Sequence, residues 1–487
     1  MQYTFLEGAN AIWHRVRAWP IAVNSPIPPV NSPLYPKGPT AWASVAYYNA
    51  PNMDFSPSPR LLAFQPGHVL TLGGDQYRIH RKLRGQAVST VWLAEHTVRG
   101  ASRRRFVALE TFDRIFSTST ALQVRAEPRS PTTDLNYIRN IIASQDRGLP
   151  GAEHCDRLRA VFLPDRHLYA VKDPTGPTVW DLQLTQPNLS FSLAVTKRII
   201  GDTLRALQYV HSFGRAAVGV ASHNLLVTQQ CSQDSMSANI VQFLQSHPPE
   251  MVDPSANRKK SSSTSGTSDT STQISPSPKT KSSTPSKGKA NSPAPPLATK
   301  ASATPKPKSL ATVLKAQPLP AFGLSPSLDN IQVRLTRCEH ATLDKQLLQT
   351  HAKEGNKPAR LIDYYHSELK LCSPEALRGA PERWSPPVNI WAIGHLAFQF
   401  LTGHYIYGLR ANPEVEGPAL PSWLELVLIS HPRTRMLEER LRAFPHATAG
   451  MSADDVRATC AFIGRCLEMD PAKRATAAEL LQDEWFR

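Results

Sequence analysis

The chain has 487 residues, a formal net charge of +16 and 43 prolines. Its length allows a large core and about two to three domain-sized units, but so many prolines argue against a single compact domain and predict irregular segments. The charge favours nucleic acid, an anionic surface or an acidic protein as partner. Half of it, however, lies in residues 251–310, which hold ten Lys or Arg and two Asp or Glu.

Cysteine usage and hydropathy indicate the cellular compartment. None of the six cysteines lies in a CxxC pair or at a metal-ligand spacing, so we expect reduced thiols in an intracellular protein, in the nucleus, the cytoplasm or both, and no metal site. No stretch reaches the roughly 18 apolar residues that a membrane helix needs, so we expect no membrane association.

The first half of the chain predicts an irregular arm followed by strands. Residues 1–65 are rich in Pro, Ser and Asn. Apolar and polar residues then alternate on both sides of a turn at Gly85, which is typical of a β-hairpin. The expected elements are a hairpin of Tyr77–Leu83 and Ser89–Ala94, a strand at Phe106–Leu109, a helix at Asp134–Ser144 and a strand at Leu168–Val171.

The second half predicts helices interrupted by a polar insert. Leu193–Phe213 has apolar residues at helical spacing, and a short strand, Asn224–Val227, follows. Residues 252–319 are mainly Ser, Thr, Pro, Lys and Ala, a composition that buries too little apolar surface to offset chain entropy. Ile331–Leu335 alternates like a strand, and most of the remaining chain is helical in pattern.

Several motifs in a fixed order resemble those of one family. Arg81–His96 reads RKLRGQAVSTVWLAEH, Ile331–Ala341 reads IQVRLTRCEHA, Ser373-Pro374-Glu375 precedes NIWAIGHLAFQFLTG, and Asp470–Phe486 reads DPAKRATAAELLQDEWF. Together these motifs are similar to those of the protein kinases. The residues of the first motif and the position of the insert resemble the SR-protein kinases and their fungal relatives. The resemblance implies an α+β, bilobal fold with a small β-rich N-lobe and a large helical C-lobe.

The same resemblance implies the domain boundaries. We expect an irregular arm at 1–65, an N-lobe at 66–173, a first part of the C-lobe at 174–251, a disordered basic insert at 252–319 and the rest of the C-lobe at 320–487.

The residues at the nucleotide positions of the family are altered. The glycine-rich loop, whose backbone N–H groups approach the phosphates, corresponds to Arg84, Gly85 and Gln86. Glu110 stands at the position of the phosphate-anchoring lysine, with the charge reversed, so it would repel a nucleotide. Asn136 stands where the family has the glutamate that holds this lysine.

The catalytic and metal positions are altered too. The proton acceptor of the catalytic loop corresponds to Gly219, while Asn224 is retained. His223 is an alternative proton acceptor, although a surface or capping histidine is the simpler interpretation. Arg337 replaces the aspartate that binds Mg²⁺. We predict that Glu110 and Arg337, which carry the exchanged charges of the family's lysine and aspartate, pair across the empty cleft.

Structural positions of the family are better preserved. The resemblance implies a buried ion pair between Glu375 and Arg474, which fixes the activation segment to the C-lobe. Asn389 stands where a helix aspartate supports the catalytic loop, and Trp391 follows it on the same helix.

These substitutions predict a pseudokinase that acts as a binding or regulatory scaffold. The alternatives are a divergent Ser/Thr kinase that transfers the ATP γ-phosphate to Ser/Arg-rich proteins, and an interaction platform that uses the basic insert. We expect no cofactor, since ATP and Mg²⁺ follow from the resemblance alone. We expect protein partners, such as Arg/Ser-rich proteins, an anionic partner for the insert and a monomeric state.

The insert also carries proline-directed motifs. Ser277, Thr284, Ser292 and Thr304 each precede a proline among lysines. Phosphates there would cancel most of the +8 charge of the segment, so we predict regulation by phosphorylation. The alternative is a plain solvated spacer.

Overall fold

The computed structural model describes residues 62–85, 89–99, 104–112, 117, 134–164, 167–217, 219–252, 313–338, 371, 373–377, 385–406 and 434–487. The chain divides into two units, one formed by Glu250–Lys315 and the other by the rest of the chain.

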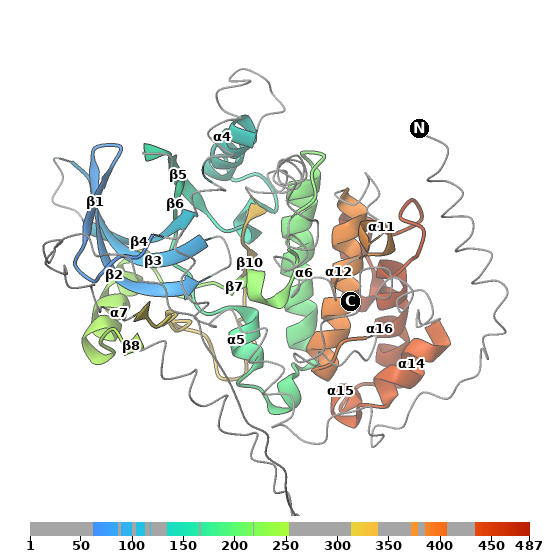
Figure 1. Ribbon diagram of the computed structural model, residues 1–487. Helices are drawn as coiled ribbons and strands as arrows, with labels where there is room; N and C mark the ends of the chain where they lie inside the picture. Colours follow the sequence, from blue (N-terminus) through green and yellow to red (C-terminus); the bar gives the residue numbers. More distant parts are fainter. Residues whose placement is uncertain are drawn as a thin grey trace, which may run out of the picture. The chain divides into compact units, whose positions relative to one another are not determined.

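The N-terminal part of the larger unit is an antiparallel sheet of six strands (Figure 1). In chain order these are β1 (Val69–Leu72), β2 (Asp75–Gly85), β3 (Ser89–Thr97), β4 (Arg104–Phe112), β5 (Leu158–Phe162) and β6 (Tyr169–Lys172). Across the sheet the order is β1-β2-β3-β4-β6-β5. The predicted hairpin is β2–β3, and the other two predicted strands are β4 and β6. Because side chains alternate between the two faces of a strand, Ala108 and Glu110 of β4 share one face.

A helix that follows the catalytic-loop segment packs on this face. Helix α7 (Gln233–Ser246) begins at the N-cap Ser232, whose hydroxyl accepts a hydrogen bond from the Ser235 amide. Its Met236 and Ile240 form one apolar cluster with β-strand side chains and with Leu319; the strand residues are Leu83, Val91, Leu93 and Ala108. The end of α7 is fixed by Arg81, which donates to the His247 carbonyl.

These contacts involve residues near two of the expected boundaries. Residues 233–246 were expected to belong to the helical lobe, yet α7 contacts β4 of the sheet. Residues 316–319 were expected at the end of the insert, yet Leu319 is 1% exposed.

The C-terminal part of the larger unit is helical. Helix α4 (Asp134–Asp146) and η1 (Ala152–His154) lie between β4 and β5 in the chain. The remaining elements of this unit follow β6 and are α5 (Val179–Gln183), η3 (Pro187–Leu189), α6 (Leu193–His211), η4 (Ser222–Asn224), β7 (Leu225–Val227), β10 (Val333–Leu335), α11 (Pro374–Leu377), α12 (Pro386–Thr402), α14 (Thr434–Arg442), α15 (Pro445–Thr448), α16 (Ala453–Cys466), α17 (Ala477–Leu481) and η8 (Glu484–Phe486). Strands β7 and β10 pair antiparallel, so the segments on either side of the insert meet.

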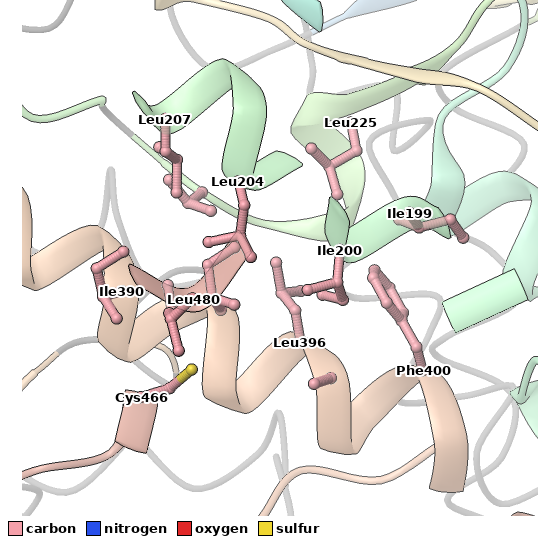
Figure 2. Close-up of a cluster of buried hydrophobic side chains, with 14 of the residues drawn as sticks. Ile199, Ile200, Leu204, Leu207, Leu225, Ile390, Leu396, Phe400, Cys466 and Leu480 are labelled. Atoms are coloured by element: carbon pink, nitrogen blue, oxygen red, sulfur yellow. The ribbon is translucent and has the colours of Figure 1, made fainter. Parts of the chain in front are cut away.

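Helix α12 is the centre of the apolar core. Residues 389–402 are all buried, which is typical of a helix covered on every side. Figure 2 shows side chains of α6 and α12, among them Leu204 and Leu396, within one buried cluster. Gly394 allows close packing against α16, because a Cβ there would lie 2.8 Å from the Cβ of Cys466.

The smaller unit is described only near its ends. Strands β8 (Met251–Val252) and β9 (Val313–Leu314) pair antiparallel, and Glu250 and Lys315 form an ion pair of 2.6 Å. The predicted phosphorylation sites, residues 253–312 of the predicted insert and residues 1–61 of the arm predicted at 1–65 lie outside the described part of the chain.

The predicted α+β class is confirmed, with an antiparallel sheet followed by a helical portion. Among the described residues, no helix has the length and apolar character needed to span a membrane.

The structure brings Glu375 and Arg474 together. The guanidinium contacts the carboxylate through two bonds, Nη1–Oε1 at 2.6 Å and Nη2–Oε2 at 3.2 Å. It also donates to the Pro387 and Glu468 carbonyls and lies over the ring of Trp391, 5.1 Å from its centre. The charge is therefore buried, but each of its three nitrogens is hydrogen-bonded, which favours a stable buried ion pair.

We expect Glu375→Ala to lower the free energy of unfolding by about 3–5 kcal/mol, because it leaves the Arg474 guanidinium buried without a carboxylate. Urea denaturation measures the change. Arg457→Ala is the matched control, since it removes an exposed pair with Asp454 and should cost about 1 kcal/mol or less. Equal losses in the two variants would contradict the structural role of the buried pair.

Candidate functional site

The candidate site lies on the sheet face that carries Glu110. Strands β4 and β6 are neighbours, with Ala108 opposite Lys172 and Glu110 opposite Ala170. In strand β3, Ser89 lies opposite Phe112. The sheet register therefore places Glu110 between side chains of two neighbouring strands.

Glu110 is held in a buried network. Its Oε1 accepts a hydrogen bond from the Ser89 hydroxyl at 2.6 Å, and its Oε2 accepts one from the Lys172 ammonium at 2.8 Å. Lys172 Nζ also lies 3.6 Å from Oδ2 of Asp156. The side chains of Lys172, Glu110 and Asp156 are each at most 3% exposed. A charge-assisted network of this kind satisfies carboxylates that would otherwise be very costly to bury.

The sequence did not indicate Lys172 or Asp156 as site residues. The one available signal was a lysine that ends the buried strand β6, because lysine is almost never fully buried unless it is paired. Its partner could not be inferred, since β4 and β6 become neighbours only when the sheet forms. Asp156 is brought into place by backbone pairing with β10, where its amide donates to the Leu335 carbonyl at 2.8 Å.

Arg84, one of the three glycine-rich-loop positions, points into a buried environment. The residue is 7% exposed, and its Nε has no hydrogen-bond partner. Burial lowers the pKa of the Arg84 guanidinium, and the carboxylates of Asp156, Glu110 and Asp181 oppose that shift. Gly85 pairs with Thr90 in the β2–β3 hairpin, while Gln86 lies outside the described residues. Arg84 is therefore a long side chain whose cation is buried beside these carboxylates.

The apolar part of the same sheet face is covered by the chain itself. Leu83, Val91 and Ala108 are 3%, 4% and 2% exposed, and they pack in the cluster with α7 and Leu319. Side chains that line a binding site for the base of a nucleotide would be expected to be exposed to solvent when no nucleotide is bound. Here the surface next to Glu110 is already buried.

Residues 217–224 are the segment that the resemblance matches to the catalytic loop, and the position expected for the proton acceptor is Gly219. Gly219 has a φ of 69°, and its carbonyl accepts a hydrogen bond from Asn224 Nδ2 at 2.8 Å. That backbone conformation favours glycine and costs other residues roughly 1–2 kcal/mol. Asn224 is buried and is used in this local contact. His223 lies next to it in η4.

Asn389 supports this segment from α12. Its Oδ1 accepts from the Ala217 amide at 2.7 Å, and its Nδ2 donates to the Ala217 carbonyl at 2.7 Å. The Oδ1 also lies 3.0 Å from Nε2 of His211, whose pKa is lowered by burial and raised by this contact, with burial the larger effect. An aspartate could not donate to the carbonyl, so the amide suits both backbone groups of Ala217.

The structure gives less detail for Arg337 and Asn136. Arg337 follows β10 with a φ of 65°, an uncommon conformation for a residue with a side chain. Glu110 contacts Ser89 and Lys172, and its pairing with Arg337 stays a prediction. Asn136 is a residue of α4, and its side chain lies outside the described part. Among the described residues, no group of three or more His, Cys, Asp or Glu side chains could hold a metal ion.

Comparisons with known proteins give little beyond the structure itself. No protein-family model and no curated protein matches the sequence. One solved structure, the crystal structure of the kinase domain of PF14_0431, is similar with a TM-score of 0.44 and 12% identity, over 88% of this chain and 99% of that chain. A similarity at that level carries no argument about this protein, and the fold stated above rests on its own elements and contacts.

We expect Lys172→Met to lower the free energy of unfolding by about 3–5 kcal/mol, because it leaves two buried carboxylates without their ammonium. Adding Glu110→Gln should recover part of the loss, with an interaction energy of about 0.5–3 kcal/mol in a double-mutant cycle. Lys315→Met, in an exposed pair, is the control and should change stability by about 1 kcal/mol or less. Additive effects of the first two substitutions would contradict the network.

Proposed function

We propose that this chain is a pseudokinase, a protein of kinase-like fold that binds or regulates partners without transferring phosphate. The observation that carries the proposal is the buried contact of Glu110 with Lys172 and Ser89. The position that would anchor a nucleotide's phosphates holds a carboxylate, and the nearby ammonium is bonded to it.

Phosphoryl transfer depends on positioning and on charge stabilisation, since the protein does little covalent chemistry. Three charges that this requires are missing or reversed. Glu110 is negative where a cation is needed, Gly219 has no side chain to accept a proton, and Arg337 is a cation where a metal ligand is needed. We therefore infer that neither ATP nor Mg²⁺ serves as a cofactor.

In contrast, the contacts that would support a kinase-like core are present. Glu375 remains bonded to Arg474, and Asn389 remains bonded to the backbone of Ala217. Retained architecture beside an altered site favours a scaffold. We propose protein partners, of which Arg/Ser-rich proteins are the class that the resemblance suggests.

We expect no transfer of labelled phosphate from ATP to an Arg-Ser repeat peptide, and no heat of ATP binding with or without Mg²⁺ in calorimetry. Loss of the proton acceptor alone typically costs on the order of 10²–10⁴ in rate, and the reversed charges add to this loss. Asn224→Ala is the control for contaminating kinases. Transfer that this substitution abolishes would establish the divergent-kinase alternative and overturn the proposal.

We further propose that the basic insert binds an anionic partner and favours nuclear residence. The test should delete residues 253–312, because the longer deletion of 252–319 would also remove the buried Leu319 and disturb the sheet. We expect a lower nuclear-to-cytoplasmic ratio and weaker salt-sensitive binding. The deletion removes both the charge and the length of the insert. A second variant, with an insert of equal length whose lysines are replaced by glutamine, removes the charge alone. Unchanged localisation and binding in both variants would leave the insert as a spacer.

A further inference from the structure

Two buried thiols lie in contact where segments far apart in the sequence meet. Cys155 follows η1, and Cys338 follows β10, 183 positions later. Their sulfur atoms are 3.0 Å apart, and the residues are 0% and 1% exposed. Cys338 is directly next to Arg337, and Cys155 is directly next to Asp156 of the Lys172 network.

The backbone holds the two segments together without help from the sulfurs. Cys155 forms an isolated parallel bridge with Leu335, and the Asp156 amide donates to the Leu335 carbonyl at 2.8 Å. The Thr336 hydroxyl donates to Oδ2 of Asp156 at 3.2 Å. Because these bonds fix the distance between the segments, the thiols are kept close in the reduced protein. A disulfide has an S–S distance of about 2.05 Å, so the sulfurs need to approach by only about 1 Å.

We propose that Cys155 and Cys338 form an oxidative modification site, at which a small peroxide converts the thiol pair to a reversible disulfide. One thiolate attacks the peroxide oxygen and becomes a sulfenic acid, releasing water. The second sulfur then attacks the sulfenic sulfur and releases a second water. With hydrogen peroxide, two thiols and one peroxide give one disulfide and two waters.

Peroxide is the suitable oxidant because it is small and uncharged. Both thiols are buried, so a bulky disulfide reagent would need a large opening, whereas peroxide can enter through local fluctuations. In an intracellular protein, a disulfide of this kind is expected to be transient and redox-sensing. Exposure alone would instead favour oxidation of Cys231, which is partly exposed.

The bond would fix the residue next to Arg337 to the loop that carries Asp156. It would close a loop of 183 positions, and a cross-link across a loop of that length stabilises mainly by restricting the unfolded chain. The oxidised protein should therefore be more resistant to heat. This inference is independent of the proposed function, since neither the thiol contact nor its oxidation depends on phosphoryl transfer.

The test uses the full chain, reduced, freed of reductant and treated with hydrogen peroxide. Peptide mapping without reduction, after alkylation under denaturing conditions, should find one linked pair of peptides containing Cys155 and Cys338. The melting temperature should rise on the order of 5 °C and return to its starting value with dithiothreitol. The mapping needs no variant, so it is decisive even where a substitution impairs folding.

Matched variants test whether the linked peptide and the rise in melting temperature come from these two cysteines. Cys155→Ser and Cys338→Ser should each abolish the linked peptide and the peroxide-dependent rise in melting temperature. Cys460→Ser should change neither, because Cys460 is equally buried and burial raises the pKa of its thiol to about 12. Cys231 shows whether the peroxide dose is sufficient. If Cys155 and Cys338 are both still free to be alkylated at a dose that fully oxidises Cys231, the proposal is overturned. A linked pair of peptides that involves other cysteines would overturn it too.

Discussion

Burial of α12 on every side is the constraint on which the helical part of the structure depends. Several residues of this buried helix contact other segments of the chain. Asn389 bonds both backbone groups of Ala217, and Trp391 lies under the Arg474 guanidinium. Gly394 lets α16 approach closely. The position of the catalytic-loop segment and the Glu375–Arg474 pair therefore both depend on how this helix is packed.

The candidate site is stabilised by charges that the chain supplies itself. A buried carboxylate such as Glu110 is costly without a cation, and Lys172 provides that cation from the neighbouring strand. The same ammonium approaches Asp156, which is fixed by backbone pairing to β10. Since α7 and Leu319 cover the apolar part of the sheet face, both the polar and the apolar portions of this surface are used in internal contacts. These contacts indicate that the residues stabilise the fold.

Paired strands lie next to the insert in the chain. Strands β8 and β9 pair at its base, and β7 and β10 pair on either side of it, so the segments that flank about 60 residues of polar chain are held together. Loop-closure entropy grows only slowly with length, which explains how so long an insertion is tolerated. The flanking residues also contribute apolar side chains to the sheet, which links the insert's attachment to the covering of the candidate site.

The sequence by itself determined the β2–β3 hairpin and helix α6, because these depend on local periodicity and on residue type. The α+β class and the altered positions Glu110 and Arg337 were expectations drawn from the family resemblance, of which the structure confirms the class. Only the tertiary structure decided that Lys172 and Asp156 accompany Glu110, that α7 covers the sheet and that Cys155 touches Cys338. These contacts join residues tens to hundreds of positions apart, and strand pairing and helix packing bring such residues together with no trace in local sequence pattern.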